Sequence, residues 1–328
     1  MAGRSVLYFD PAPGEYRNVI ERHVPEGFEV WFWEDMSPAE QQEKLAAADY
    51  LLVVSKRLDA SLLNAAKRAR YIQRTGAGVT NIDVETATKI GLPVCVLPGG
   101  NSVAVAEMTI LMILALYRKL PLIHRDMREG RWPNWEYRPR SYEMAGKTHG
   151  LIGFGHIGRE TARRSRVFGT RILYYDPYRA PADVERELDA EYLPFEKVLR
   201  EADILSIHVP LVPATRGMIG MAELRSMKRN AVLINVARGG VVREKDLYEA
   251  LRDGIIAGAG IDTWESEPTP ADNPLLSLDN VVATPHIAAG TIDTFERVIR
   301  LAFQNIAKAE SDHCPDYVVN GLEKVRRQ

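Results

Sequence analysis

This chain contains very little cysteine. It also has no strong excess of charge of one sign and no long apolar run. The 328 residues include two cysteines, Cys95 and Cys314, too few for a disulfide framework or a cysteine metal cluster. We therefore expect no metal site, a buried small apolar residue at Cys95 and an incidental surface thiol at Cys314. This cysteine usage is typical of a reducing, cytoplasmic compartment.

The chain also lacks features that would direct it to nucleic acid or to a membrane. Its formal net charge of −2 gives no electrostatic reason to expect either an anionic membrane or a nucleic-acid partner. The first ten residues lack the apolar core of a signal peptide. The most apolar segment, residues 103–117, is interrupted by Glu107 and is too short to span a bilayer. With 46% hydrophobic and 26% charged residues, the composition indicates a globular protein long enough for two domains.

The most informative stretch is the hexapeptide Gly-Phe-Gly-His-Ile-Gly at residues 153–158. An apolar run precedes it, and a helical pattern and a second apolar run follow. In such a strand–turn–helix–strand unit, Gly153 permits the turn, Gly155 lets a pyrophosphate approach, and Gly158 lets the helix pack on the sheet. Asp176 lies 18 residues after Gly158, where a carboxylate accepts hydrogen bonds from the adenosine ribose and disfavours NADP(H). We therefore predict a dinucleotide site.

Short apolar runs alternate with amphipathic helical patterns along the whole chain, which predicts parallel α/β sheets. Before the hexapeptide, we expect strands at residues 6–9, 50–54, 71–73 and 94–97, and helices at residues 39–48, 61–69 and 84–90. One buried helix from residue 102 to about 127 is expected to connect two domains. After the hexapeptide, we expect strands at 172–175, 204–209, 232–236, 257–261 and 281–284, and helices at 195–202, 222–227, 244–252 and 292–309. The tail, residues 312–328, is expected to fold back on the N-terminal unit.

Polar side chains directly follow four of the strands expected after the hexapeptide. They are His208, Arg238, Asp262 and His286. Because ligands bind at the carboxyl ends of parallel strands, these residues can converge beside the cofactor. An arginine suits bidentate capture of a carboxylate, and a histidine backed by a carboxylate suits proton transfer. Glu267 is the candidate for that carboxylate, and Glu265 is its rival.

Each of these residues also has a purely structural interpretation. His208, like His149, is more readily a structural histidine than an acid or base. Arg238 can be a surface arginine in a turn, and Glu267 can be a carboxylate at a helix start. The loop Arg-Thr-Gly-Ala-Gly-Val at residues 74–79 is either a glycine-rich turn or a nest of N–H groups that holds a carboxylate.

Several motifs, in one order, resemble the D-2-hydroxyacid dehydrogenase family. They are Gly-Ala-Gly at 76–78, Val-Ala-Glu at 105–107, ADILSIHVPL at 202–211, NVARGGVV at 235–242, GAGID at 258–262, Glu-Pro at 267–268 and Thr-Pro-His at 284–286. The resemblance extends from about residue 51 to residue 320. It implies an NAD-dependent oxidoreductase of α/β class with two Rossmann-like or flavodoxin-like domains. A substrate domain of residues 1–100 and 291–328 would then surround an inserted NAD-binding domain of residues 101–290.

The same resemblance implies roles for individual residues. Arg238 binds the substrate carboxylate, His286 donates the proton in reduction, and Glu267 is the partner of His286. The backbone amides of Ala77 and Gly78 also bind the carboxylate. The expected cofactor contacts are Gly153, Gly155, His156, Ile157, Gly158, Asp176, Pro177, His208, Val209, Pro210, Thr215, Val236, Ala237 and, near the nicotinamide amide, Asp262.

Two positions in the chain bear on the substrate. Members acting on 3-phosphoglycerate usually carry an arginine at the end of the second strand, where this chain offers only Lys56 or Arg57. Glu267 stands where relatives acting on formate carry glutamine. We therefore expect a small 2-keto acid such as glyoxylate or hydroxypyruvate. The alternatives are a 3-phosphoglycerate dehydrogenase and an NAD(H)-sensing interaction protein on the same fold, like the co-repressors that resemble this family.

Residues 131–142, here called the arm, combine aromatic and arginine side chains with no helical or strand periodicity. One interpretation is that the arm caps the nucleotide domain. The other is a two-fold homodimer built on the arm and the helix before it, because aromatic residues and arginine are enriched at buried interfaces. The family resemblance favours the dimer and suggests that Trp135 reaches the substrate pocket of the partner.

Overall fold

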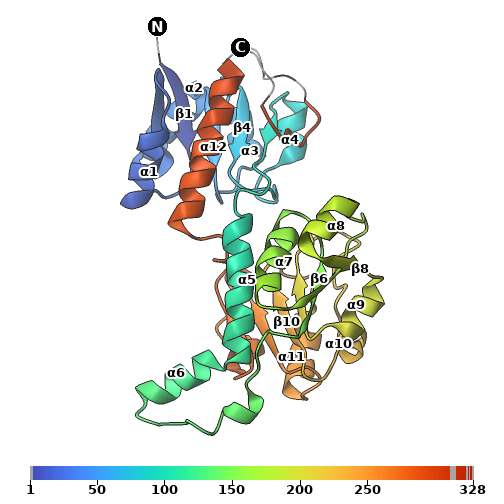
Figure 1. Ribbon diagram of the computed structural model, residues 1–328. Helices are drawn as coiled ribbons and strands as arrows, with labels where there is room; N and C mark the ends of the chain where they lie inside the picture. Colours follow the sequence, from blue (N-terminus) through green and yellow to red (C-terminus); the bar gives the residue numbers. More distant parts are fainter. Residues whose placement is uncertain (1–2, 311–314, 323, 325, 327–328) are drawn as a thin grey trace. The chain divides into compact units, whose positions relative to one another are not determined.

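The computed structural model describes residues 3–310, 315–322, 324 and 326. The chain divides into two compact units, Met1–Asn101 with Gly290–Gln328, and Ser102–Ala289. Each unit is a parallel sheet flanked by helices (Figure 1), which confirms the predicted α/β class. Within the described residues, no helix is long and apolar enough to cross a membrane.

The first unit contains a five-stranded sheet in the order β2-β1-β3-β4-β5, the order of flavodoxin-like folds. Its strands are β1 (Arg4–Tyr8), β2 (Phe28–Phe32), β3 (Tyr50–Val53), β4 (Tyr71–Arg74) and β5 (Val94–Cys95). Its helices are α1 (Glu15–His23), α2 (Pro38–Ala47), α3 (Ala60–Ala65), α4 (Val84–Lys89) and α12 (Ile292–Glu310), with a 3₁₀ turn at Trp33–Asp35. Helix α12 lies beside α1 (Figure 1) and packs Val298, Ile299 and Phe303 into the core.

Two elements of this unit, α1 and β2, are missing from the sequence-based prediction. Strand β2 is an edge strand in which no residue is fully buried, so its sequence lacks a clear apolar run.

The expected return of the tail is confirmed for its described part. The Val96 N–H donates to the Tyr317 carbonyl at 3.1 Å and the Val319 N–H to the Val94 carbonyl at 2.9 Å. Cys95 is buried in β5, whereas Cys314 lies outside the described residues.

The second unit contains a seven-stranded sheet in the order β12-β11-β10-β9-β6-β7-β8, which is the Rossmann order with one added strand. The strands are β6 (Thr148–Ile152), β7 (Arg171–Tyr175), β8 (Ala190–Tyr192), β9 (Ile204–Ile207), β10 (Val232–Asn235), β11 (Gly258–Ile261) and β12 (Val281–Ala283). The helices are α5 (Ser102–Tyr117), α6 (Leu120–Arg128), α7 (His156–Val167), α8 (Ala182–Leu188), α9 (Phe195–Glu201), α10 (Met221–Ser226) and α11 (Glu244–Arg252), with 3₁₀ turns at Arg138–Arg140 and Pro274–Ser277. The strand order reverses between β6 and β9, where a dinucleotide binds in such sheets.

The single helix expected from residue 102 to about 127 is wrong, because two helices stand in its place. Helix α5 ends at Tyr117, Lys119 adopts a left-handed φ of 53°, and α6 begins at Leu120. Pro121 explains the break, because it has no N–H to donate to the Tyr117 carbonyl four residues earlier. That carbonyl instead accepts the N–H of Tyr142 at 3.0 Å, which attaches the end of the arm to α5.

A buried histidine lies between α7 and the sheet of the second unit. His149 Nδ1 lies 2.8 Å from Ser165 Oγ, and its Nε2 lies 2.8 Å from Ser206 Oγ. Burial lowers the pKa of His149 from 6.5 to about 3, so the side chain is neutral at physiological pH. Its two hydrogen bonds satisfy both ring nitrogens inside the core.

We expect the protein to lose stability as the pH falls below about 6.5. Because the pKa of His149 is lower in the folded state, the unfolded state binds more protons between pH 6.5 and 3. The free energy of unfolding therefore falls by up to ~1.4 kcal/mol per pH unit for this residue. In denaturant titrations from pH 7 to pH 4, H149L should flatten that slope. H124N, which removes an exposed imidazole, should retain it, and an H149L slope equal to the wild-type slope would contradict the prediction.

Candidate active site

The loop Gly153–Gly158, here called the glycine loop, needs its glycines for close backbone approaches. Gly153 has a φ of 98°, and a Cβ at Gly158 would lie 2.3 Å from the Gly153 carbonyl oxygen. Gly155 faces open space, and no side chain caps α7 there. The first N–H groups of α7 are therefore available to a pyrophosphate, as a helix N-terminus requires for anion binding.

Asp176 follows β7 and braces the glycine loop from the neighbouring strand. Its Oδ2 accepts the N–H of Phe154 at 2.8 Å, and its Oδ1 accepts the N–H of Tyr178 at 2.9 Å. Each oxygen keeps a second lone pair for a ribose hydroxyl. Arg179, the nearby cation that could attract a 2′-phosphate, is paired bidentately with Glu185 at 2.9 and 3.0 Å. These residues fit NAD(H) better than NADP(H).

The side chains of His286 and Glu267, the residues expected to act as an acid–base pair, are hydrogen-bonded to each other. His286 Nδ1 lies 2.8 Å from Glu267 Oε2, and both side chains are partly exposed, at 46% and 39%. With Nδ1 engaged, Nε2 is the ring nitrogen that can exchange a proton with a substrate. The rival carboxylate, Glu265, instead accepts the N–H of Glu244 at 3.0 Å, so it serves the N-terminal turn of α11.

The loop that carries His286 is held by Asp262, whose side chain is fully buried. The Asp262 Oδ1 accepts hydrogen bonds from the Thr284 hydroxyl at 2.5 Å and the Ile287 N–H at 2.8 Å. Its Oδ2 accepts the Ala288 N–H at 3.0 Å, and its backbone carbonyl accepts the His286 N–H at 2.7 Å. These bonds hold His286 at a left-handed φ of 52°, a conformation that a non-glycine residue keeps only when its surroundings enforce it.

Trp264 joins the three loops that carry the predicted catalytic residues. Its N–H donates to Glu267 Oε1 at 3.0 Å, and its indole Nε1 donates to the Thr284 carbonyl at 3.0 Å. Its carbonyl oxygen would lie 1.8 Å from a Cβ at Gly239, so only glycine allows the turn after Arg238 to lie against this loop. Sequence reasoning missed both positions. The only signals were the tryptophan before the two glutamates and the Gly-Gly pair after Arg238.

Arg238 lies on a braced turn after β10. The Asn235 side chain bonds to the Arg238 carbonyl and the Ala237 N–H, and the Arg238 guanidinium donates to the Ala237 carbonyl at 2.6 Å. The second unit thus pairs His286 with Glu267 and places Arg238 on an adjoining turn. Ala77 and Gly78 belong to the first unit, in the loop after β4, where Ala77 is exposed.

His208 follows β9 and shares a 2.8 Å hydrogen bond with Ser206 through Nε2. Burial lowers the pKa of His208 to about 3, so it is uncharged at neutral pH and unsuited to act as the acid. The other expected cofactor contacts follow β6, β7, β9 and β10, on the carboxyl side of the sheet. They are His156, Ile157, Pro177, Val209, Pro210, Thr215, Val236 and Ala237.

Comparison with known proteins adds to this geometry. Residues 110–288 match the NAD binding domain of the D-isomer specific 2-hydroxyacid dehydrogenases. The chain is 40% identical over 314 residues to the glyoxylate reductase of Korarchaeum cryptofilum, covering 93% of this chain and 94% of that protein. It is 37% identical over 317 residues to the D-3-phosphoglycerate dehydrogenase of Methanocaldococcus jannaschii, covering 96% of this chain but 59% of that longer protein.

A solved structure agrees as well. The D-lactate dehydrogenase of Lactobacillus jensenii, crystallised with NAD+, is similar with a TM-score of 0.83 and 31% identity, over 96% of this chain and 99% of that one. The family, enzyme class and NAD cofactor expected from the motifs are therefore confirmed. With its matching nucleotide-binding domain and these relatives, the chain belongs to the D-isomer specific 2-hydroxyacid dehydrogenase family.

Proposed function

We propose that this protein reduces a small 2-keto acid, such as glyoxylate or hydroxypyruvate, reversibly to the corresponding 2-hydroxy acid. The observation that carries the proposal is the 2.8 Å His286–Glu267 pair, at the carboxyl side of a Rossmann sheet, with Arg238 on the adjoining turn. The intact pair favours an enzyme over the alternative of an NAD(H)-sensing interaction protein. The glyoxylate reductase relative supports this class of substrate.

In this mechanism, Arg238 binds the substrate carboxylate bidentately. The N–H groups of Ala77 and Gly78 are the further carboxylate ligands that the resemblance implies. Protonated His286 gives the proton on Nε2 to the carbonyl oxygen during reduction and takes it back during oxidation. Glu267 fixes the ring through Nδ1 and stabilises the imidazolium.

The cofactor has its own set of residues in this proposal. NAD(H) supplies the hydride for reduction and accepts it in oxidation. The N–H groups of the glycine loop would hold its pyrophosphate, and Asp176 its adenosine ribose.

The two cysteines of the chain fit the cytoplasmic location that we propose.

The contacts of Lys56 in the first unit favour a small keto acid over 3-phosphoglycerate. Lys56, one of two cations near the position of the phosphate-binding arginine, is paired with Glu34 at 3.3 Å and lies 5.5 Å from the Trp33 ring. It is therefore engaged elsewhere on its own unit.

NADH absorbance with a panel of 2-keto acids tests the substrate assignment. Glyoxylate or hydroxypyruvate should give the highest kcat/KM, and 3-phosphohydroxypyruvate as the best substrate would overturn the assignment.

We expect NADH to be preferred over NADPH by about ten-fold or more in kcat/KM, because Asp176 repels a 2′-phosphate and Arg179 is already paired. D176S should narrow that ratio by weakening NADH and admitting NADPH. The measurement is steady-state kinetics with both cofactors at saturating keto acid. An equal or higher kcat/KM with NADPH in the wild type would refute the assignment.

The catalytic roles predict distinct kinetic defects. H286A should lower kcat about 10²–10⁴-fold, because it removes the proton donor. R238A should raise KM and lower kcat together, because the carboxylate contact also orients the substrate. In E267Q, keto-acid reduction should fall off at a lower pH than in the wild type, because a neutral amide no longer stabilises the imidazolium.

E265Q is the matched control for E267Q. It makes the same change two residues away, on a carboxylate bonded to Glu244 rather than to His286. Its pH–rate profile should overlay that of the wild type. If E267Q also overlays the wild type, or if E265Q shifts instead, the His286–Glu267 pairing in catalysis is wrong.

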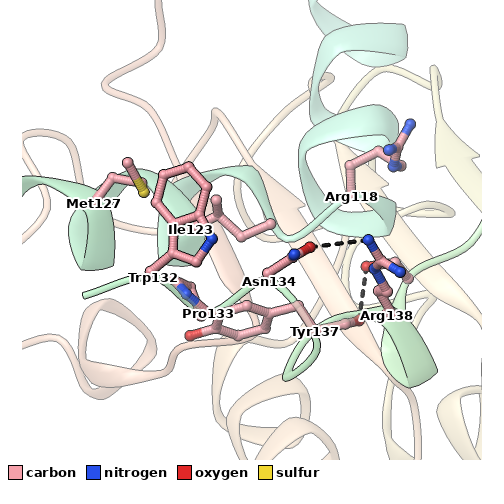
Figure 2. Close-up of a pocket in the computed structure, with 9 residues that line it drawn as sticks. Arg118, Ile123, Met127, Trp132, Pro133, Asn134, Tyr137 and Arg138 are labelled. Carbon is pink, nitrogen blue, oxygen red and sulfur yellow. Dashed lines mark hydrogen bonds between the residues drawn. The ribbon is translucent and has the colours of Figure 1, made fainter.

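We also propose that the protein is a homodimer built on the arm, α5 and α6. Trp132 and Trp135 are 76% and 74% exposed, so these indoles do not cap their own nucleotide domain. Trp132 lines a pocket of about 370 Å³ together with Ile123, Met127 and Tyr137, among others (Figure 2). Exposed aromatic surface of this kind is typical of protein interfaces.

If Trp135 reaches the substrate pocket of the partner chain, two variants that are each impaired should restore activity when they are combined in one dimer. W135A chains and H286A chains are dissociated, mixed and reassociated. In a mixed dimer, the chain with a working His286 receives an intact Trp135 from its partner, so activity should reappear. The two variants reassociated separately are the controls. Impaired W135A without rescue would place Trp135 in its own chain's site, and a monomer in sedimentation would refute the dimer.

A further inference from the structure

A chain of hydrogen bonds crosses the second unit from the amino side of the sheet to its carboxyl side. It links Thr170, Ser165, His149, Ser206 and His208, and each of its four links is 2.8 Å long. The three central side chains are completely buried. Part of His208 reaches the surface, yet its Nδ1 is buried and has no hydrogen-bond partner among the described residues.

Ser206 determines how protons are arranged in this chain. Its hydroxyl has a single hydrogen, and its two partners are the Nε2 atoms of His149 and His208. It can donate to only one of them, so that nitrogen must be bare. The other nitrogen must carry a proton and donate to Ser206, because a buried hydroxyl is stabilised only when its bonds are made. The two histidines therefore hold opposite tautomers at Nε2.

The hydrogen bonds can run in either of two directions along this chain, and the two directions leave different numbers of polar groups without a partner. If donation runs from Thr170 to Ser165, His149, Ser206 and His208 in turn, the one group left over is an N–H at His208 Nδ1. If donation runs the other way, two groups are left over. They are the Thr170 hydroxyl hydrogen, which has no further acceptor in the described part of the chain, and a bare His208 Nδ1. The first direction satisfies one more buried polar group.

We infer that this hydrogen-bond chain keeps the proton of His208 on Nδ1, so that His208 presents an N–H donor to an oxygen of the bound dinucleotide. Thr170, Ser165, His149 and Ser206 are then positioning residues for His208. The inference rests on the proposed NAD(H) site. The acceptor is an oxygen of the class that a dinucleotide offers: phosphate, ribose hydroxyl or carboxamide carbonyl.

The location of His208 supports this role. Its Nε2 is turned back toward Ser206, and the two nitrogens of an imidazole point to different sides of the ring, so Nδ1 faces away from Ser206. The glycine loop lies against His208: a Cβ on Gly153 would be 2.7 Å from the His208 carbonyl carbon, and one on Gly158 would be 3.9 Å from the His208 Cβ. Both histidines are neutral because burial lowers the pKa of each to about 3. A tautomer, rather than a charge, is thus what the chain controls.

The first test is ¹⁵N NMR of the intact protein labelled at its histidine rings, with His208 assigned by the signals missing in H208N. In the cofactor-free protein, His208 should show a protonated Nδ1 and a bare Nε2. Saturation with NADH should shift the Nδ1 resonance. A proton found on Nε2, or an Nδ1 signal that NADH leaves unchanged, would overturn the inference.

Variants at Ser206 provide a second, independent measurement. S206A removes the donor to Nε2, so His208 should become a mixture of tautomers and the Kd for NADH, from its fluorescence, should rise roughly 3- to 10-fold. S206T keeps the hydroxyl and should restore both the tautomer and the Kd. T109V is the matched control, because it removes a buried hydroxyl that donates to the Val105 carbonyl within α5, and it should change neither.

The outcomes also separate this inference from the proposed function. If the wild type does not bind NADH, the proposed function fails, and the inferred donor contact to the dinucleotide fails with it. If NADH binds and S206A and T109V have equal affinity, the proposed function stands and the role of the hydrogen-bond chain is refuted.

Discussion

The loop that carries His286 depends on the hydrogen bonds of one buried side chain, Asp262. Burying a polar group is strongly unfavourable unless hydrogen bonds replace those that it makes with water. Here the donors come from the Thr284 hydroxyl and from the backbone just after His286. The loop therefore cannot relax without leaving buried polar atoms of Asp262 unpaired, so these hydrogen bonds fix the position of His286 relative to the core of the sheet.

Much of this arrangement could be predicted from the sequence, where local signals and topology agree. The glycine loop and Asp176 follow from a motif with a known physical basis. Strands β9, β10 and β11 are buried at every residue and consist mostly of apolar residues, so the sequence predicts them. The short or half-buried elements β2, α8 and β8 lack clear apolar runs and were missed. The helix break at Pro121 was also missed, because the apolar pattern continues on both sides of it.

The site itself was predictable only in part, because its support depends on contacts between distant loops. The ends of parallel strands placed His286 and Arg238 on one side of the sheet, but spacing could not choose between Glu265 and Glu267. The choice depends on α11, whose first N–H groups attract the nearer carboxylate. The need for glycine at Gly239 arises from the Trp264 carbonyl, which comes from a different loop.

The arm is attached to the helices before it at its middle and at its C-terminal end. The Tyr137 hydroxyl donates to the buried Asp126 at 2.8 Å, and the Tyr142 N–H donates to the α5 carbonyl that Pro121 leaves without a partner. Arg138 lies 4.1 Å from the Trp135 ring and bonds to Asn134. The exposed indoles are thus preorganised before any partner arrives. In the dimer that we propose, association would then sacrifice little conformational entropy, because the segment is already ordered in the free chain.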